Sequence, residues 1–189
     1  MTDDAGALAD MDRAVAGAEV IVGGIKAVQW ADPTPCTGLD VRTLVNHLVT
    51  GNLLFAALAN EAPPPDRSLD HLGDDPLAAF RRAGAALHEA FAQPGVLVRS
   101  YAAPFGTGSG LALVRTRIIE NLGHGWDLAR ATGQPACFPG DVAERALAAA
   151  RRSLATRPEG ASAPFAPEVQ VPQDAPVIDR LAGFLGRTV

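Results

Sequence analysis

Apolar residues recur at intervals of three and four positions along several long segments of the chain, and prolines and glycines separate these segments. The pattern is clearest over residues 41–59, where Val41, Leu44, Leu48 and Phe55 fall on one stripe of a helix. Such a stripe predicts a helix that buries one face against its neighbours. The same pattern predicts further helices over residues 3–30, 75–91, 111–132, 141–155 and 176–186.

Turn-forming residues mark the ends of these helices. Asp40 has the position of an N-cap before the helix over 41–59, and Gly133 has that of a C-cap after the helix over 111–132. Gly23 and Gly24 weaken the first helix without ending it. Residues 94–110 are expected to form a loop or a brief extended piece. Their glycines favour a flexible turn over a phosphate-binding loop, because no Lys-Ser or Lys-Thr follows them.

The composition indicates an all-α fold. Of the 189 residues, 48% are hydrophobic but only 5% are aromatic, and runs of β-branched residues are scarce. A chain of this length can bury a core as one domain, so residues 1–189 are expected to form a single domain. Residues 157–176 are rich in proline, and we expect them to be irregular and to dock the last helix onto the bundle.

Charge and segment length exclude several classes of protein. A formal net charge of −5 argues against a nucleic-acid surface, which needs clustered Lys and Arg. The sequence has no run of 18 apolar residues and begins with acidic residues, so it predicts a cytoplasmic protein with no membrane segment. In that compartment Cys36 and Cys137 are expected to stay thiols. Cys36 is expected to have a buried or capping role, because the sequence shows no base beside it.

The candidate chemistry lies on the helix over 111–132. Glu120 and His124 are four residues apart, so their side chains lie on one helix face and could bind a divalent cation together. His47, on the helix over 41–59, could bring a second imidazole. Two histidines and one carboxylate would leave coordination positions open, as catalytic metal sites do. The alternative is a buried Glu120–His124 pair without a metal, with His47 bonded to a carbonyl.

Two neighbours on the same helix are also candidates for function. Asp127 could accept a proton from the imidazole of His124 or orient a metal-bound water; its alternative is a surface ion pair with Arg130. Arg117 could bind a substrate carboxylate or the acid group of a thiol cofactor; its alternative is an exposed arginine.

Four other residues are expected to lie outside the metal site or at its edge. Trp126 is expected to pack in the core, and Asn46 to contact a loop or line the pocket. His71 and His88 are expected to be exposed to solvent.

Four sequence segments carry a resemblance to a known family. They are PTPCTGLDVRTLVNHLVTGN, PFGTGSG, ENLGHGWDLARATG and VPQDAPVIDRLAGFLGR. Together they resemble an actinobacterial family of metal-binding proteins similar to the N-terminal domain of mycothiol-dependent maleylpyruvate isomerase, in the DinB-like superfamily. The resemblance implies a DinB-like four-helix bundle with additional short C-terminal helices. It also implies a cation, usually zinc, held by His47, Glu120 and His124.

The resemblance further implies a function. In the isomerase the cation is thought to activate a low-molecular-weight thiol, and relatives act as thiol transferases or metal-dependent hydrolases. The isomerase also has a C-terminal domain that contributes to its active site, whereas a short tail follows the bundle here, so isomerisation of maleylpyruvate itself is not expected.

The sequence therefore predicts a metal-dependent enzyme that activates a mycothiol-type thiol or water for transfer, isomerisation or hydrolysis. The alternative is a non-catalytic metal-binding or regulatory module. Zinc is the first choice of metal, although nitrogen and oxygen donors also admit nickel, manganese and iron. The expected partner is a small-molecule substrate or thiol cofactor, and helix faces rich in Ala and Gly leave a homodimer open.

Overall fold

The chain is almost entirely helical. The computed structural model describes residues 4–103, 106–153 and 166–189. Within these ranges it contains six α-helices, one short 3-10 helix and one hairpin. Their bounds are α1 Asp4–Gly23, η1 Ala27–Gln29, α2 Val41–Ala59, α3 Pro76–Phe91, β1 Ser100–Ala103, β2 Gly106–Ser109, α4 Gly110–Thr132, α5 Gly140–Ser153 and α6 Val177–Phe184. The predicted all-α class is confirmed.

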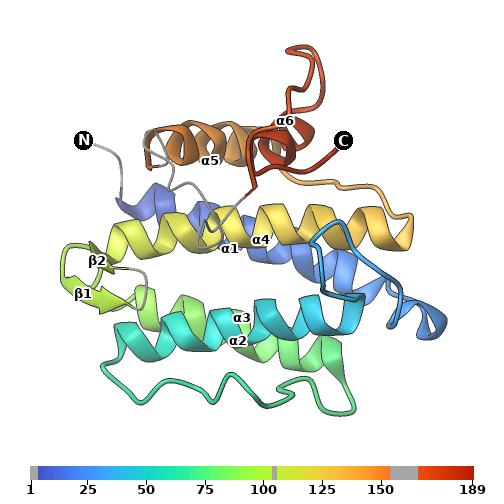
Figure 1. Ribbon diagram of the computed structural model, residues 1–189. Coiled ribbons are helices and arrows are strands. Elements are labelled where there is room, and N and C mark those ends of the chain that lie inside the picture. Colours follow the sequence, from blue (N-terminus) through green and yellow to red (C-terminus); the bar gives the residue numbers. More distant parts are fainter. Residues whose placement is uncertain (1–3, 104–105, 154–165) are drawn as a thin grey trace.

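Helices α1 to α4 form a four-helix bundle, and α5 and α6 cover one of its sides (Figure 1). Helix α2 packs mainly on α3, and α1 packs mainly on α4. Helices α5 and α6 pack on each other and on α4. As a result α4 lies between the bundle and the C-terminal helices, and every residue from 121 to 129 is buried.

The start of α2 is fixed by its cap and by the loop before it. The Asp40 carboxylate accepts a hydrogen bond from the Thr43 backbone N–H at 2.8 Å, so the predicted N-cap is confirmed. The backbone N–H of Val41 donates to the Asp32 carbonyl at 3.0 Å. These bonds hold the loop that contains Cys36 against the first turn of the helix.

Glycines allow α4 to lie close to its neighbours and to end cleanly. A Cβ at Gly125 would lie 2.5 Å from the Phe138 ring, which is closer than real Cβ contacts. Gly133 has a φ of 67°, and its backbone N–H bonds to the last carbonyls of the helix, so the predicted C-cap is confirmed.

The prediction of one helix from residue 3 to Trp30 was wrong. Helix α1 ends at Gly23, and η1 follows it as a separate short element. The Gln134 side chain donates to the Ile21 carbonyl at 3.0 Å, and it packs so tightly that a Cβ at Gly24 would lie 2.1 Å from its Oε1. A side chain from a distant loop therefore forms a hydrogen bond with a terminal carbonyl of α1, at the point where the two glycines weaken the helix.

The other boundaries agree more closely with the sequence pattern. The segment over 94–110 contains the hairpin β1–β2, in keeping with the expected brief extended piece. Residues 166–176 are irregular, and the Val169 N–H donates to the Gly183 carbonyl at 2.9 Å, while residues 154–165 lie outside the described ranges. The assignment of residues 1–189 to a single domain stays a prediction.

No helix in the described part of the chain combines the length and the apolar character that crossing a membrane requires.

Candidate metal centre

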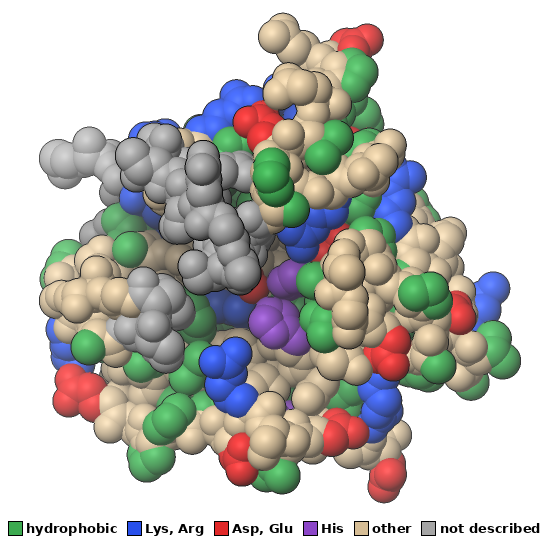
Figure 2. Space-filling model, in the orientation of Figure 1, with side chains coloured by type: hydrophobic (Ala, Val, Ile, Leu, Met, Phe, Trp, Pro, Cys, Tyr) green, Lys and Arg blue, Asp and Glu red, His purple; other side chains and the backbone are tan. Residues whose placement is uncertain are grey.

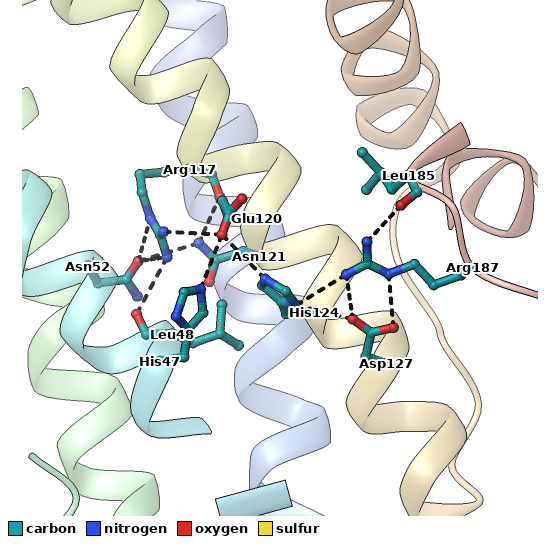
Figure 3. Close-up of polar contacts among 10 residues, drawn as sticks. All are labelled: His47, Leu48, Asn52, Arg117, Glu120, Asn121, His124, Asp127, Leu185 and Arg187. Carbon is teal, nitrogen blue, oxygen red and sulfur yellow. Dashed lines mark hydrogen bonds and ion pairs between the residues drawn. The ribbon is translucent and has the colours of Figure 1, made fainter. Parts of the chain in front are cut away.

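Helices α2 and α4 bring His47, Glu120 and His124 together (Figure 3). His47 Nε2 lies 3.4 Å from Glu120 Oε2, and His124 Nε2 lies 3.3 Å from the same oxygen. The donor atoms of the three residues all lie within 4.8 Å of one another. The rings of the two histidines meet edge to face, with 5.0 Å between their centroids.

These separations suit a divalent cation. Zinc bonds to nitrogen and oxygen donors at about 2.0–2.1 Å, which puts the donors of a tetrahedral site about 3.3–3.4 Å apart. The two N···O distances have this value, and the three donor atoms all lie within 4.8 Å of one another. Two imidazoles and a carboxylate also form a donor set that zinc and several other first-row metals accept.

The site is accessible from one side. The side chain of His47 is 40% exposed, whereas that of His124 is 9% exposed. Figure 2 shows histidine side chains on the floor of a hollow in this face, with Lys or Arg side chains beside them. A small molecule can therefore approach the donor atoms from the His47 side.

Arg117 supports Glu120 from within the core. It is 2% exposed, so the alternative of an exposed arginine was wrong. Its guanidinium donates to Asn52 Oδ1 at 2.8 and 3.1 Å, and Nη1 lies 4.0 Å from Glu120 Oε2. Burial lowers the pKa of Arg117 to about 10, so it stays charged at neutral pH. Its role in binding a substrate acid stays a prediction.

The carboxyl of Glu120 is ionised despite its burial. Burial by itself would raise its pKa. The hydrogen bonds to His124 and His47, together with the positive charge of Arg117, outweigh that effect and hold the pKa of Glu120 well below its usual value. A largely buried carboxylate, 18% exposed, can thus accept hydrogen bonds or bind a cation.

Asp127 and Arg187 hold the opposite edge of the His124 ring. Asp127 is fully buried, and its Oδ2 lies 3.1 Å from His124 Nδ1. Arg187 donates to both Asp127 oxygens, at 2.8 and 3.2 Å. The alternative surface pair between Asp127 and Arg130 was wrong, because Arg130 lies 3.6 Å from Asp179 instead.

This arrangement fixes the state of the His124 ring. A carboxylate facing Nδ1 keeps a proton on that nitrogen, so Nε2 is the atom presented to Glu120 and His47. Burial would lower the pKa of His124, but hydrogen bonds to Asp127, Cys36 and Glu120 raise it well above its usual value. Without a metal, this raised pKa favours the imidazolium form of His124.

Sequence reasoning missed three contributors: Asn52, which holds Arg117, and also Arg187 and Cys36. Arg187 lies 60 residues after Asp127, and no periodicity links its segment to α4. Cys36 comes from the loop before α2, yet its sulfur lies within 4.8 Å of donor atoms of His124 and Asp127. The tertiary fold thus supplies the imidazole neighbour that the sequence around Cys36 lacks.

The remaining candidates lie outside this cluster. Asn46 donates to the Leu69 carbonyl at 3.1 Å and so contacts the loop after α2. His71 was expected to be exposed but is half-buried, and its ring lies 2.7 Å from the Asp66 carbonyl. His88 is exposed as expected and pairs with an aspartate of α1. Trp126 packs in the core as expected, 1% exposed.

Comparison with known proteins gives a consistent assignment. A family model described as the mycothiol maleylpyruvate isomerase N-terminal domain matches residues 11–129. Two relatives from Mycobacterium tuberculosis, uncharacterized protein MT0763 and uncharacterized protein Rv0738, are each 36% identical over 170 residues, which is 89% of this chain and 91% of the relative. No solved structure gives a significant match. The match to the family model spans His47, Glu120 and His124.

The buried Asp127–Arg187 pair leads to a stability prediction. Asp127→Asn should lower the free energy of unfolding by about 3 kcal/mol, because removing one partner leaves the other buried charge uncompensated. The control is Asp179→Asn. In the native protein the indole N–H of Trp126 donates to Asp179 at 2.7 Å, and the asparagine keeps an oxygen for this bond. The control variant should therefore lose less than about 1 kcal/mol. Urea unfolding of both variants measures the difference; equal losses would contradict the assigned role of Asp127.

Proposed function

Because the chain belongs to the mycothiol maleylpyruvate isomerase N-terminal domain family, we propose that it is a divalent-metal-binding bundle protein that activates a thiol or water. His47, Glu120 and His124 hold the cation. Zinc is the proposed metal, and a mycothiol-type thiol is the proposed ligand. The proposed compartment is the cytoplasm, where low-molecular-weight thiols are kept reduced.

The observation that carries this proposal is the spacing of the donor atoms. Separations of 3.3 and 3.4 Å between each imidazole nitrogen and one carboxylate oxygen match two edges of a tetrahedral coordination shell. A divalent cation held by these three residues would lower the pKa of a coordinated thiol or water toward neutrality and so would supply a nucleophile.

The surrounding residues prepare the three ligands. Hydrogen bonds to His124 and His47, with the charge of Arg117 as a smaller contribution, keep the pKa of Glu120 low. The Asn52 side-chain oxygen accepts hydrogen bonds from the Arg117 guanidinium and holds it in place. Asp127 directs Nε2 of His124 toward the site. His47 lies on the exposed side, where a small molecule enters through the hollow. Three protein ligands with one open side are the arrangement of catalytic zinc sites.

A second candidate function is a bundle that uses the same residues without a metal. It is favoured by the charge balance of the network, in which an imidazolium at His124 lies between the carboxylates of Glu120 and Asp127. In that case the cluster stabilises the helix packing and performs no turnover.

Metal content distinguishes the two candidates. After reconstitution with zinc and removal of free metal, tag-free protein should retain about one equivalent by elemental analysis. His47→Ala and Glu120→Ala should each lose it. His88→Ala is the matched control, because His88 pairs with Asp12 away from the site, and it should retain metal. Absence of metal from the parent protein would favour the metal-free candidate.

Metal binding should release a proton. The raised pKa of His124 means that its imidazole is protonated at neutral pH, and a cation at Nε2 must displace that proton. Apparent affinity should therefore rise about tenfold per pH unit until the pH passes the pKa of His124. Titration calorimetry in buffers of different ionisation enthalpy counts the protons released.

The variant Asp127→Asn tests the number of protons that metal binding releases. It removes a carboxylate that raises the pKa of His124, so fewer protons should be released at the same pH. In the metal-free protein, the raised pKa of His124 also stabilises the fold. This contribution to the free energy of unfolding is fully present below the pKa of histidine in the unfolded chain, and it is lost as the pH rises through the pKa of His124 in the folded protein. An affinity independent of pH would contradict the assignment of His124 as a ligand.

Replacing zinc with cobalt(II) tests whether a thiol binds to the metal. Addition of a small thiol such as glutathione to the cobalt protein should produce an intense ultraviolet charge-transfer band, and its S-methyl derivative should not. The open side at His47 gives the thiol room to bind. A cobalt spectrum unchanged by thiol would favour water as the activated ligand.

A further inference from the structure

The buried apolar side chains of the described residues form two clusters. One cluster includes Leu44, Leu48 and Val49 of α2, and the other includes Phe55 and Ala59 of the same helix. Helices α1, α3 and α4 also contribute to both clusters. Apolar contacts are not directional, so neither cluster by itself fixes how far α4 is shifted along α2.

Three polar side chains lie between α2 and α4, next to the proposed metal ligands (Figure 3). They are Asn52, Arg117 and Asn121, all of them buried, and we call them the polar layer. The Asn52 side-chain oxygen accepts hydrogen bonds from Nε and Nη2 of Arg117, at 3.1 and 2.8 Å, and from Nδ2 of Asn121 at 3.4 Å. One residue of α2 thus binds two residues of α4 that are one helical turn apart.

The backbone of α2 also receives the guanidinium of Arg117. Its Nη2 donates to the Leu48 carbonyl at 3.4 Å, and a Cβ at Gly51 would lie 2.6 Å from its Nη1. A side chain at residue 51 would therefore collide with the guanidinium. Hydrogen bonds are directional, so these contacts fit one register of the two helices. A shift of α4 by one turn, about 5.4 Å, would break all of them.

The polar layer leaves two buried atoms without hydrogen-bond partners. Arg117 has only N–H donors, so the Asn52 oxygen must face it, and the Asn121 amide nitrogen donates to the Arg117 carbonyl at 2.8 Å. Asn52 Nδ2 and Asn121 Oδ1 then have no partner among the described residues. Such atoms lower stability, and apolar side chains can often replace a buried polar cluster without loss. Stability therefore does not explain why this layer is polar.

We propose that the polar layer sets the register of α4 against α2 and so positions the donor atoms of the two helices against each other. His47 directly precedes Leu48, whose carbonyl the guanidinium contacts. Glu120 lies between Arg117 and Asn121 in one turn of α4. A single buried polar residue fixes the register of coiled coils in the same way. The positioning requires no metal, although its importance for function rests on the proposed metal site.

The first experiment replaces the polar layer by apolar side chains of similar total volume, in the triple variant Asn52→Leu/Arg117→Met/Asn121→Ala. Urea unfolding should show that this variant is at least as stable as the parent protein. The rings of His47 and His124 have their centroids 5.0 Å apart, so metal-free parent protein should give a nuclear Overhauser effect between their ring protons. This signal should weaken severalfold in the variant, because the two helices no longer hold one register.

Zinc affinity gives a second readout. The triple variant should bind zinc at least about tenfold more weakly than the parent. Loss of the Arg117 charge would by itself strengthen cation binding, so a weaker affinity points to misplaced ligands. Thr50→Val is the control: it removes a buried hydroxyl two residues before Asn52, and among the described residues this hydroxyl forms no hydrogen bond to α4. Both readouts should stay at the parent level in the control.

The variant Gly51→Ala disturbs the polar layer without removing a polar group. Its new Cβ forces the guanidinium away from α2, so the same Overhauser signal should weaken. Gly84→Ala is its control, because a Cβ there would lie 2.9 Å from Val15, between α1 and α3. A signal of parent intensity in the folded triple variant would overturn the proposal. If the triple variant does not fold, the same result in Gly51→Ala protein would overturn it.

The two readouts separate this inference from the proposed function. A parent protein that binds no zinc would contradict the proposed function, and the Overhauser comparison in metal-free protein would still decide the positioning role. If the parent binds zinc and the folded triple variant keeps both the signal and the affinity, the positioning role alone is contradicted.

Discussion

A carboxylate that leaves water must be compensated by a partner, and α4 buries one carboxylate fully and a second one largely. Glu120 and Asp127 lie on either side of His124, and each has an arginine behind it, Arg117 for the first and Arg187 for the second. The result is a row of alternating charges across the interior (Figure 3). Each member depends on the next, because an unpaired charge in this environment costs several kcal/mol.

The row connects two parts of the fold. Arg117 is held by Asn52 of α2, inside the four-helix bundle, whereas Arg187 follows α6 and belongs to the covering layer. Helix α4 is the shared element, and it is buried on both sides over residues 121–129. The C-terminal helices therefore cover the core and also shape the candidate site. They lie outside the match to the family model, which ends at residue 129.

Sequence patterns predicted the parts that local physics determines. Helical periodicity located all the long helices, and the caps at Asp40 and Gly133 were recognisable because their hydrogen bonds are local. The i, i+4 spacing placed Glu120 beside His124. Features that depend on packing were missed: the end of α1, the burial of Arg117, and the approach of Arg187 and Cys36. Each of these depends on a contact between distant segments, for which the sequence gives no period.

The distance in sequence between Asp127 and Arg187 also orders events during synthesis. The two residues are 60 positions apart, and chains grow at about 5–20 residues per second, so Asp127 is made about 3–12 s before its partner. During that interval α1 to α4 can pack while one carboxylate on α4 still needs water. Only when the segment after α6 has been made can Arg187 pair with Asp127, so docking of the C-terminal segment also completes the row of charges.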